Sequence, residues 1–356
     1  MKIKQAFSNK VLYIDREVHA EYHRGKIVFL NKDDEEISSI AINTGTAAKI
    51  LSRNTWTERI FRLEPRYLSR VSSNKYIMSH NGRLYELDPE AGTMQKLFDY
   101  AKGTKNPLHF CSYTRNNTCE IVFGDYGGHD GMGNVGIYRL KNHAVTEISS
   151  IPGTTINHIH AVEYDKYRDC YWILTGDTDE GSGFWKVSYE GGEAEPFLLG
   201  KQKYRACFSF ITEKEIFYAT DTPLEENCLF KLDIESKRLT KLMDMPGSCI
   251  YGMRVPGREN TLCFATAVEP DSSLPRWRYL CTYKLGAGIK DRKSHIFYGD
   301  PDSGFTEVWA CMKDRLPMVL FQFGNVRFPT QLIENKVYIC PQACGKQDHT
   351  MELAPE

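Results

Sequence analysis

The sequence predicts an all-β fold, a single β-propeller of seven blades with four antiparallel strands each. Short runs of β-branched and aromatic residues alternate with turn residues, and long amphipathic helical patterns are absent. Similar hairpins recur roughly every 45 residues, a period typical of propeller blades. The 356 residues fit one such domain, residues 1–356, with a frayed polar tail over 346–356. Six blades is the alternative, if strands from the two ends of the chain share a blade.

The expected strands follow in chain order. Before residue 54 they are residues 19–22, 26–30 and 38–42. From residue 66 on, the innermost strands should begin near Tyr67, His109, His158, Arg205, Tyr251 and Trp309. The third strands of the blades are expected at residues 82–88, 136–140, 183–188 and 228–233. Residues 127–133, 269–276 and 290–303 are expected to form loops on the rim.

The composition argues against several classes of function. Lysine and arginine total 45 and aspartate and glutamate total 46, so no net field favours a nucleic-acid partner. No apolar run approaches the ~20 residues of a membrane-spanning helix. The basic start of the chain lacks a sustained apolar segment, so we expect no signal peptide. The eleven cysteines, mostly in apolar strands, are typical of reduced thiols and indicate a cytoplasmic protein.

One hairpin, over residues 157–179, brings three reactive side chains to one end. His158 and His160 lie on the same side of its first strand, because side chains alternate along a strand. The second strand returns from a polar turn and ends at Gly176 and Asp177, beside the start of the first. Two imidazole groups and a carboxylate should therefore converge.

A polar residue ends the second strand in nearly every repeat. These residues are His80, Asp125, Asp177, Asp221, Glu269 and Asn325. In a propeller, the innermost strands begin on the same face. The polar residues near those beginnings are His109, His158, His160, Arg205 and Tyr251. We expect both groups to line one funnel; the alternative is that each aspartate or asparagine only closes a turn.

Candidate roles divide these residues into two sets. The candidate catalytic residues are His158, His160, Asp177, Arg205, Asp221 and Tyr251. The candidate substrate-binding residues are His80, His109, Asp125, Tyr126, His129, Glu269, Gln322 and Asn325. His129 belongs to a glycine-rich loop beside Asp125 that would let it reach across the mouth, although a plain flexible loop is the alternative.

The pair His158 and His160 has three interpretations. The two side chains pack and hydrogen-bond between blades, or they supply two ligands to a divalent metal ion, or one of them is a general acid or base. Two histidines separated by one strand residue can reach a single ion. A divalent metal ion is thus possible, but the sequence requires no cofactor.

Short segments beyond residue 60 carry a resemblance to known proteins. They are residues 123–126, 158–165, 175–177, 204–206, 220–223, 266–270 and 321–325. Together they resemble uncharacterised bacterial propellers of the sialidase-like, Asp-box (BNR-repeat) superfamily that accompany polysaccharide genes. The resemblance implies a carbohydrate-active propeller. Sialidase activity itself is not implied, because the Asp-box is degenerate at residues 188–196 and only residues 327–329 approach the Arg-Ile-Pro element.

The chain also resembles propeller polysaccharide lyases, which place histidine, tyrosine and arginine around a uronate, in some cases with a metal ion. A lyase acting on an acidic glycan would use His160 or Tyr251 as the base and Arg205 to hold the carboxylate. A glycoside hydrolase would draw two carboxylates from Asp125, Asp177, Asp221 and Glu269. The other classes are a non-catalytic propeller that binds a glycan or a protein of a polysaccharide-assembly system, and a propeller enzyme of another chemistry.

Overall fold

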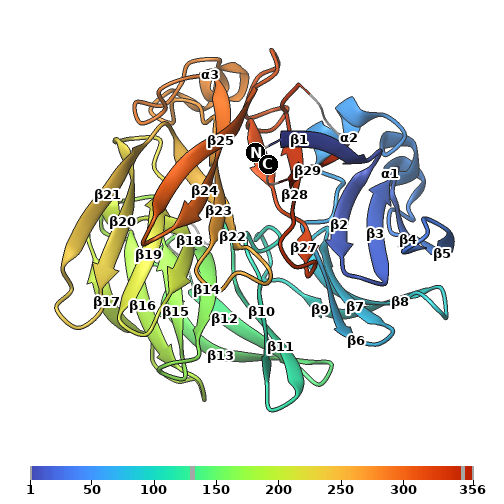
Figure 1. Ribbon diagram of the computed structural model, residues 1–356, viewed down its shortest axis with the longest axis horizontal. Coiled ribbons are helices and arrows are strands. Elements are labelled where there is room, and N and C mark those ends of the chain that lie inside the picture. The colour runs from blue at the N-terminus through green and yellow to red at the C-terminus, as the bar shows by residue number, and fades with distance from the viewer. Residues whose placement is uncertain (1, 129–132, 346–348, 355–356) are drawn as a thin grey trace.

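The computed structural model describes residues 2–128, 133–345 and 349–354. Its strands form seven blades in a ring around a central axis, with four antiparallel strands in each blade (Figure 1). The innermost strands of neighbouring blades lie side by side around the ring. The protein is therefore the all-β, seven-bladed propeller that the sequence predicts, and the six-bladed alternative is wrong.

Six blades consist of four consecutive strands each. The first two are β2 (Lys10–Ile14), β3 (Val18–His23), β4 (Lys26–Asn31), β5 (Glu36–Ala41), and β6 (Tyr67–Ser72), β7 (Lys75–His80), β8 (Arg83–Asp88), β9 (Thr93–Asp99). The third and fourth are β10 (Cys111–Arg115), β11 (Thr118–Gly124), β12 (Asn134–Lys141), β13 (Ala144–Pro152), and β14 (Ile159–Asp165), β15 (Cys170–Thr175), β16 (Gly183–Ser188), β17 (Glu195–Leu199). The fifth and sixth are β18 (Ala206–Ile211), β19 (Glu215–Thr220), β20 (Asn227–Asp233), β21 (Leu239–Met245), and β22 (Ser248–Arg254), β23 (Leu262–Ala267), β24 (Lys293–Asp300), β25 (Gly304–Met312).

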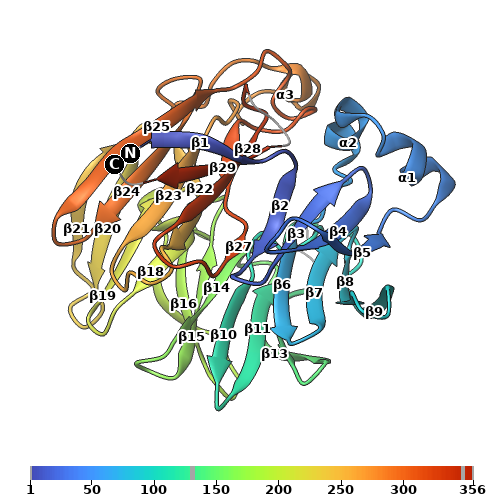
Figure 2. The same cartoon turned by 45° about the vertical axis from the view of Figure 1, so that its right-hand side comes forward.

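The seventh blade joins the two ends of the chain. It contains β26 (Asn325–Arg327), β28 (Val337–Gln342), β29 (Thr350–Ala354) and β1 (Lys2–Phe7). β1 pairs antiparallel with β29, and β27 (Thr330–Gln331) pairs parallel with β2 of the first blade. Figures 1 and 2 show the two ends of the chain next to each other at this seam. Residues 350–354 are thus a paired strand with buried side chains at Thr350, Met351 and Leu353, so the frayed tail predicted over 346–356 is wrong for this stretch.

The inner strands of a blade are apolar on both faces because each blade lies between two others. β15 (CYWILT) is buried along its whole length. Its Tyr171 and Ile173 pack with residues of the third blade such as Val122, while Leu174 packs with Tyr218 of the fifth. Burying one such aliphatic side chain contributes about 1.5–3 kcal/mol. Outermost strands are half-exposed, as the mixed burial of β21 shows.

Three short helices and a 3-10 turn interrupt the strands in the described part of the chain. α1 (Thr46–Leu51) and α2 (Thr55–Phe61) connect the first two blades, α3 (Arg276–Cys281) lies in the long β23–β24 loop, and the 3-10 turn is Gln202–Tyr204. Asn54 caps α2 by accepting a hydrogen bond from the amide of Trp56 at 2.8 Å. None of these helices is long and apolar enough to cross a membrane.

Two expectations about the sixth blade are wrong. Trp309 lies in β25, the outermost strand of that blade, rather than at the start of an innermost strand. Residues 290–303, expected as a rim loop, contain β24.

All eleven cysteines are free thiols that form no disulfide bond.

Candidate functional site

Asp177 is the centre of a cluster built from the fourth and fifth blades. Its carboxylate lies 3.3 Å from Nδ1 of His158, 3.7 Å from Nε2 of His160 and 3.3 Å from Nη2 of Arg205. Asn157 donates a hydrogen bond to it at 3.0 Å. The convergence predicted from the hairpin register is therefore present, with His158 and Asp177 just outside β14 and β15 and Arg205 just before β18.

The backbone at Gly176 and Asp177 restricts which residue types can occupy these two positions. A Cβ atom at Gly176 would lie 2.2 Å from Cε1 of His160, so glycine is needed for the imidazole to approach. Asp177 has φ = +79°, a region that L-residues other than asparagine and aspartate rarely enter. Such strain is characteristic of functional sites, where the surrounding structure holds it in place.

Burial and charge set the protonation states in this cluster. Burial raises the pKa of Asp177, but the two imidazoles of His160 and His158 and the guanidinium of Arg205 outweigh it and hold the pKa well below its usual range. Burial lowers the pKa of His158 to about 3, against the opposing pull of Asp177. At neutral pH the cluster therefore holds an ionised carboxylate beside a neutral imidazole.

A second pair of carboxylates lies on the other side of Arg205. Asp221 is 3.6 Å from Nε of Arg205 and accepts a hydrogen bond from the thiol of Cys207 at 3.0 Å. Burial and the charge of Asp221 raise the pKa of Glu269 to about 7, although Arg205 lowers it. Burial and Asp221 also raise the pKa of Cys207, which keeps this residue a neutral thiol.

Tyr251 forms the centre of a second cluster, from the sixth blade. Its hydroxyl group accepts a hydrogen bond from Nη1 of Arg66 at 3.2 Å, and the guanidinium of Arg327 lies 5.7 Å from the centre of its ring. His109 lies against the same ring, at 5.4 Å between centroids, and donates from Nε2 to the carbonyl oxygen of Ile250 at 2.8 Å. Burial alone would raise the pKa of Tyr251, but Arg327 and Arg66 together bring it below the usual value for tyrosine.

The two clusters lie near each other, and we call the region between them the funnel. The ring of Tyr126 packs edge-on against His158, with centroids 4.4 Å apart. Burial raises the pKa of Tyr126, Arg66 lowers it, and Asp177 and Asp221 raise it further, so Tyr126 feels the charges of both clusters. A cavity of about 50 Å³ lies beside Arg66 and Arg327.

Other predicted site residues are held in structural contacts. Nε2 of His80 lies 2.8 Å from Oδ1 of Asn43. Asp125 accepts hydrogen bonds from the amide of Gly136 at 3.0 Å and the hydroxyl of Tyr138 at 3.1 Å. These bonds agree with the alternative in which this aspartate only closes a turn. Asn325 begins β26 instead of ending a second strand, and it donates to the carbonyl oxygen of Phe323.

Two predicted binding residues remain without a place in either cluster. Gln322 is buried and has φ = +71°. His129 lies outside the described residues.

The funnel concentrates buried polar atoms that have no hydrogen-bond partner in the described part of the chain. They are Nδ1 and Nε2 of His158, Oδ1 of Asp221, Oε2 of Glu269 and Nε of Arg66 and Arg205. Buried polar groups are nearly always satisfied in folded proteins. Water or a polar ligand would satisfy these atoms.

The residues around Asp177 fit a divalent metal ion. One ring nitrogen of His158, one ring nitrogen of His160 and a carboxylate oxygen of Asp177 lie within 4.8 Å of one another. His160 donates from Nδ1 to the carbonyl oxygen of Ala206 at 3.1 Å, so its Nε2 presents a lone pair toward the same point when the ring is neutral. Two imidazoles and one carboxylate suit a transition-metal ion. The alternative set of His160, Cys207 and Asp221 fits less well, because the raised pKa of Cys207 disfavours a thiolate.

Sequence reasoning did not single out Arg66, Arg327 or Cys207 as site residues. Arg66 occupies the position directly before β6, as His158 does before β14 and Arg205 does before β18. That shared register is a signal the sequence contains. Arg327 ends the three-residue strand β26, which has no apolar pattern to locate it.

No protein-family model and no curated protein matches the sequence. Among solved structures, the fold is similar to that of an oligogalacturonate lyase from Vibrio parahaemolyticus, with a TM-score of 0.59 and 10% identity over 99% of this chain and 91% of that chain. An oligogalacturonate lyase in complex with manganese gives a TM-score of 0.54 at 9% identity, over 99% and 90% of the two chains. A chain of the mitotic checkpoint complex gives 0.55 at 8% identity, over 99% and 93%. At such identities the similarity concerns the fold, which hosts many functions.

Proposed function

We propose that the protein is a polysaccharide lyase that acts on an acidic, uronate-containing glycan bound in the funnel. The observation that carries the proposal is the position of Tyr251 between Arg66 and Arg327, with its pKa lowered in spite of burial. The fold similarity to two proteins described as oligogalacturonate lyases is in line with this assignment.

Elimination from a uronate requires a base and a cation close together. The base removes the proton from the carbon next to the carboxylate, the electron pair forms a carbon–carbon double bond, and the glycosidic oxygen leaves and is protonated. Negative charge grows on the carboxylate during proton removal, so cationic side chains must face it. Tyr251 as the base, with arginines on both sides, meets both requirements.

Arg66 and Arg327 suit the carboxylate-binding role better than Arg205. Arg205 already faces two carboxylates, those of Asp177 and Asp221. Arg327 has one distant acidic partner, Glu64, at 3.8 Å, and Arg66 has no acidic partner among the described residues. An arginine with uncompensated charge retains its full attraction for a substrate carboxylate. Arg66 and Arg327 therefore replace Arg205, the residue expected from the sequence, in the proposed carboxylate-binding role.

A metal ion would be held by His158, His160 and Asp177, and when bound it would supply a further positive charge for a substrate oxygen. Tyr126 and His158 form one wall beside that position. Asn157 and Arg205 orient the carboxylate of Asp177 from the other side.

A glycoside hydrolase is the second candidate, and one observation favours it. Glu269 has a pKa raised to about 7, whereas Asp177 is ionised, and a protonated and an ionised carboxyl group are the two components of glycosidic hydrolysis. Glu269 would then be the general acid.

Product analysis tests the proposal and separates it from its alternatives. Purified protein is incubated with oligomers of galacturonate, glucuronate and guluronate, with and without MnCl2. A lyase gives products with the ultraviolet absorbance of an unsaturated uronate, whereas a hydrolase gives new reducing ends without that absorbance. Binding without any cleavage, measured by calorimetry, would show a non-catalytic glycan-binding propeller and overturn the proposal.

A further inference from the structure

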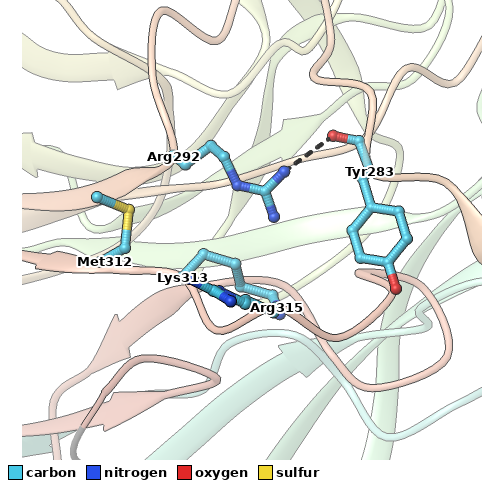
Figure 3. Close-up of a pocket in the computed structure, with 5 residues that line it drawn as sticks. All are labelled: Tyr283, Arg292, Met312, Lys313 and Arg315. Carbon is cyan, nitrogen blue, oxygen red and sulfur yellow. Dashed lines mark hydrogen bonds between the residues drawn. The ribbon is translucent and has the colours of Figure 1, made fainter.

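A second concave site lies on the funnel face, at the sixth blade. It is a cavity of about 440 Å³ lined by Tyr283, Arg292, Met312, Lys313 and Arg315. Figure 3 shows Arg292 between Met312 and Tyr283, with Lys313 and Arg315 opposite. We refer to these five residues as the rim pocket.

The topology places the rim pocket on the same face as the funnel. The loop after β23 and the end of β25 lie on the face where second strands end and fourth strands end in every blade. One loop, residues 268–292, carries Glu269 to the funnel and Tyr283 and Arg292 to the rim pocket. The amide of Gly286 donates to the carbonyl oxygen of Glu269 at 3.0 Å, so the two parts of this loop are tied together.

The charge of the rim pocket is positive and only partly compensated. Lys313 is paired with Asp314, which also pairs with Arg59 at 2.8 Å. Arg292 donates to the backbone carbonyl oxygen of Tyr283 at 3.3 Å, as Figure 3 shows, and forms no ion pair with an acidic side chain within the described residues. Arg315 is exposed and likewise has no ion-pair partner there.

The aromatic ring adds a second type of contact. The guanidinium of Arg292 lies 5.8 Å from the centre of the Tyr283 ring, and 47% of Tyr283 is exposed. An exposed ring beside guanidinium groups can stack on a sugar face while the arginines hold its carboxylate. The apolar side chain of Met312, 54% exposed, completes the wall.

We propose that the rim pocket is a remote subsite for a uronate unit of the same oligosaccharide whose reacting unit lies in the funnel. This inference rests on the proposed function. It implies that the substrate is an oligomer long enough to extend from the funnel over the loop of residues 268–292, and that chain length is recognised by a second carboxylate.

Calorimetric titration with galacturonate oligomers of increasing length tests the inference. Three proteins are compared: the wild type, Arg292→Ala/Arg315→Ala, and the control Arg16→Ala/Arg238→Ala. The control removes the same charge from turns on the opposite face, between β2 and β3 and between β20 and β21. Melting temperatures are measured for all three.

The wild type and the control should bind long oligomers more tightly than short ones. Arg292→Ala/Arg315→Ala should lose about tenfold or more of its affinity for long oligomers and keep its affinity for the shortest oligomer within about twofold.

Three outcomes would overturn the inference. Equal affinity of the wild type and the variant for long oligomers would show that the pocket is not used. Equal losses for short and long oligomers would place the arginines in the funnel's own binding or in folding. Absence of binding at every length would overturn the proposed function together with this inference, whereas the first two outcomes leave the proposed function intact.

Discussion

The hydroxyl group of Tyr251 and Nη1 of Arg66 meet at 3.2 Å although their blades, the sixth and the second, are not neighbours in the ring. The hydrogen bond therefore crosses the funnel. It also brings a positive charge to a half-buried phenol, and the first two predictions follow from this contact and from Arg327 beside it.

Replacement of Tyr251 by phenylalanine should lower kcat by about 10²–10⁴-fold, the usual contribution of a positioned base. Affinity for an acidic oligosaccharide should change by no more than about threefold, because the arginines remain. The free energy of unfolding should fall by about 1 kcal/mol for the lost hydrogen bond. Tyr167→Phe, in an exposed turn of the fourth blade, is the matched control. Undiminished kcat in Tyr251→Phe would exclude the tyrosine as the base.

Replacement of Arg327 by glutamine should move the rising limb of the pH–rate profile to higher pH. Arg327 is the largest influence that lowers the pKa of Tyr251, so its loss should raise that pKa. The active form of the tyrosine is the deprotonated one, hence the rate at a fixed pH below this limb should fall. Arg327→Lys, which keeps the charge, should restore most of the profile; an unchanged limb in Arg327→Gln would assign it to another group.

Replacement of His158 by glutamine should abolish tight binding of Mn²⁺, measured by calorimetry and by metal analysis of dialysed protein. Stability without metal should change by no more than about 1 kcal/mol, because the one polar contact of His158 among the described residues is that of Nδ1 with Asp177 at 3.3 Å. His160→Gln should cost about 1 kcal/mol, since it breaks the bond to Ala206.

His295→Gln serves as the control for the metal experiment. His295 is another buried histidine, paired with Asp291 and Glu307 in the sixth blade. Metal binding should be unchanged in this variant. Full retention of metal by His158→Gln, or a large loss of stability in that variant with metal affinity intact, would support packing as the role of the histidine pair.

Glu269 should make the protein less stable as the pH rises from 4.5 to 7. The folded state raises the pKa of this carboxyl from 4.5 to about 7, so in that window the unfolded chain releases the proton while the folded chain retains it. The glutamine variant lacks this loss. The difference in unfolding free energy, Glu269→Gln minus wild type, should therefore grow by up to about 3 kcal/mol between pH 4.5 and 7. A difference independent of pH in urea titrations would contradict the raised pKa.

Much of the fold follows from local patterns. Blades three to five were located from the sequence because each has two apolar inner strands joined by a polar turn and followed by aspartate. The seventh blade could not be located from the sequence. Its innermost strand, β26, has only three residues, and its outermost strand, β1, comes from the other end of the chain. Trp309 was misplaced because β25 is as aromatic and β-branched as an inner strand; its exposure is decided by its position at the edge of the blade.

The two clusters of the funnel differ in how far the sequence could predict them. Asp177, His158 and His160 share one hairpin, so the alternation of a strand suffices to bring them together. Tyr251, Arg66 and Arg327 come from three blades, and their meeting depends on the curvature and closure of the ring. Asp125 and His80 fit the same register as Asp177, but Asp125 bonds within its own blade and His80 bonds to Asn43 in the connection from the first blade.

The pairing of β1 with β29 has a consequence for the order in which the molecule assembles. During synthesis the first six blades can each collapse as local hairpins, but the seam has no partner for β1 until residues 350–354 have left the ribosome. Closing so long a loop is slow, because its entropy is lost before the contacts form. Arg327 lies in the last blade to be synthesised. A nascent chain should therefore form most of the propeller while it is still inactive, because Arg327 is not yet in place.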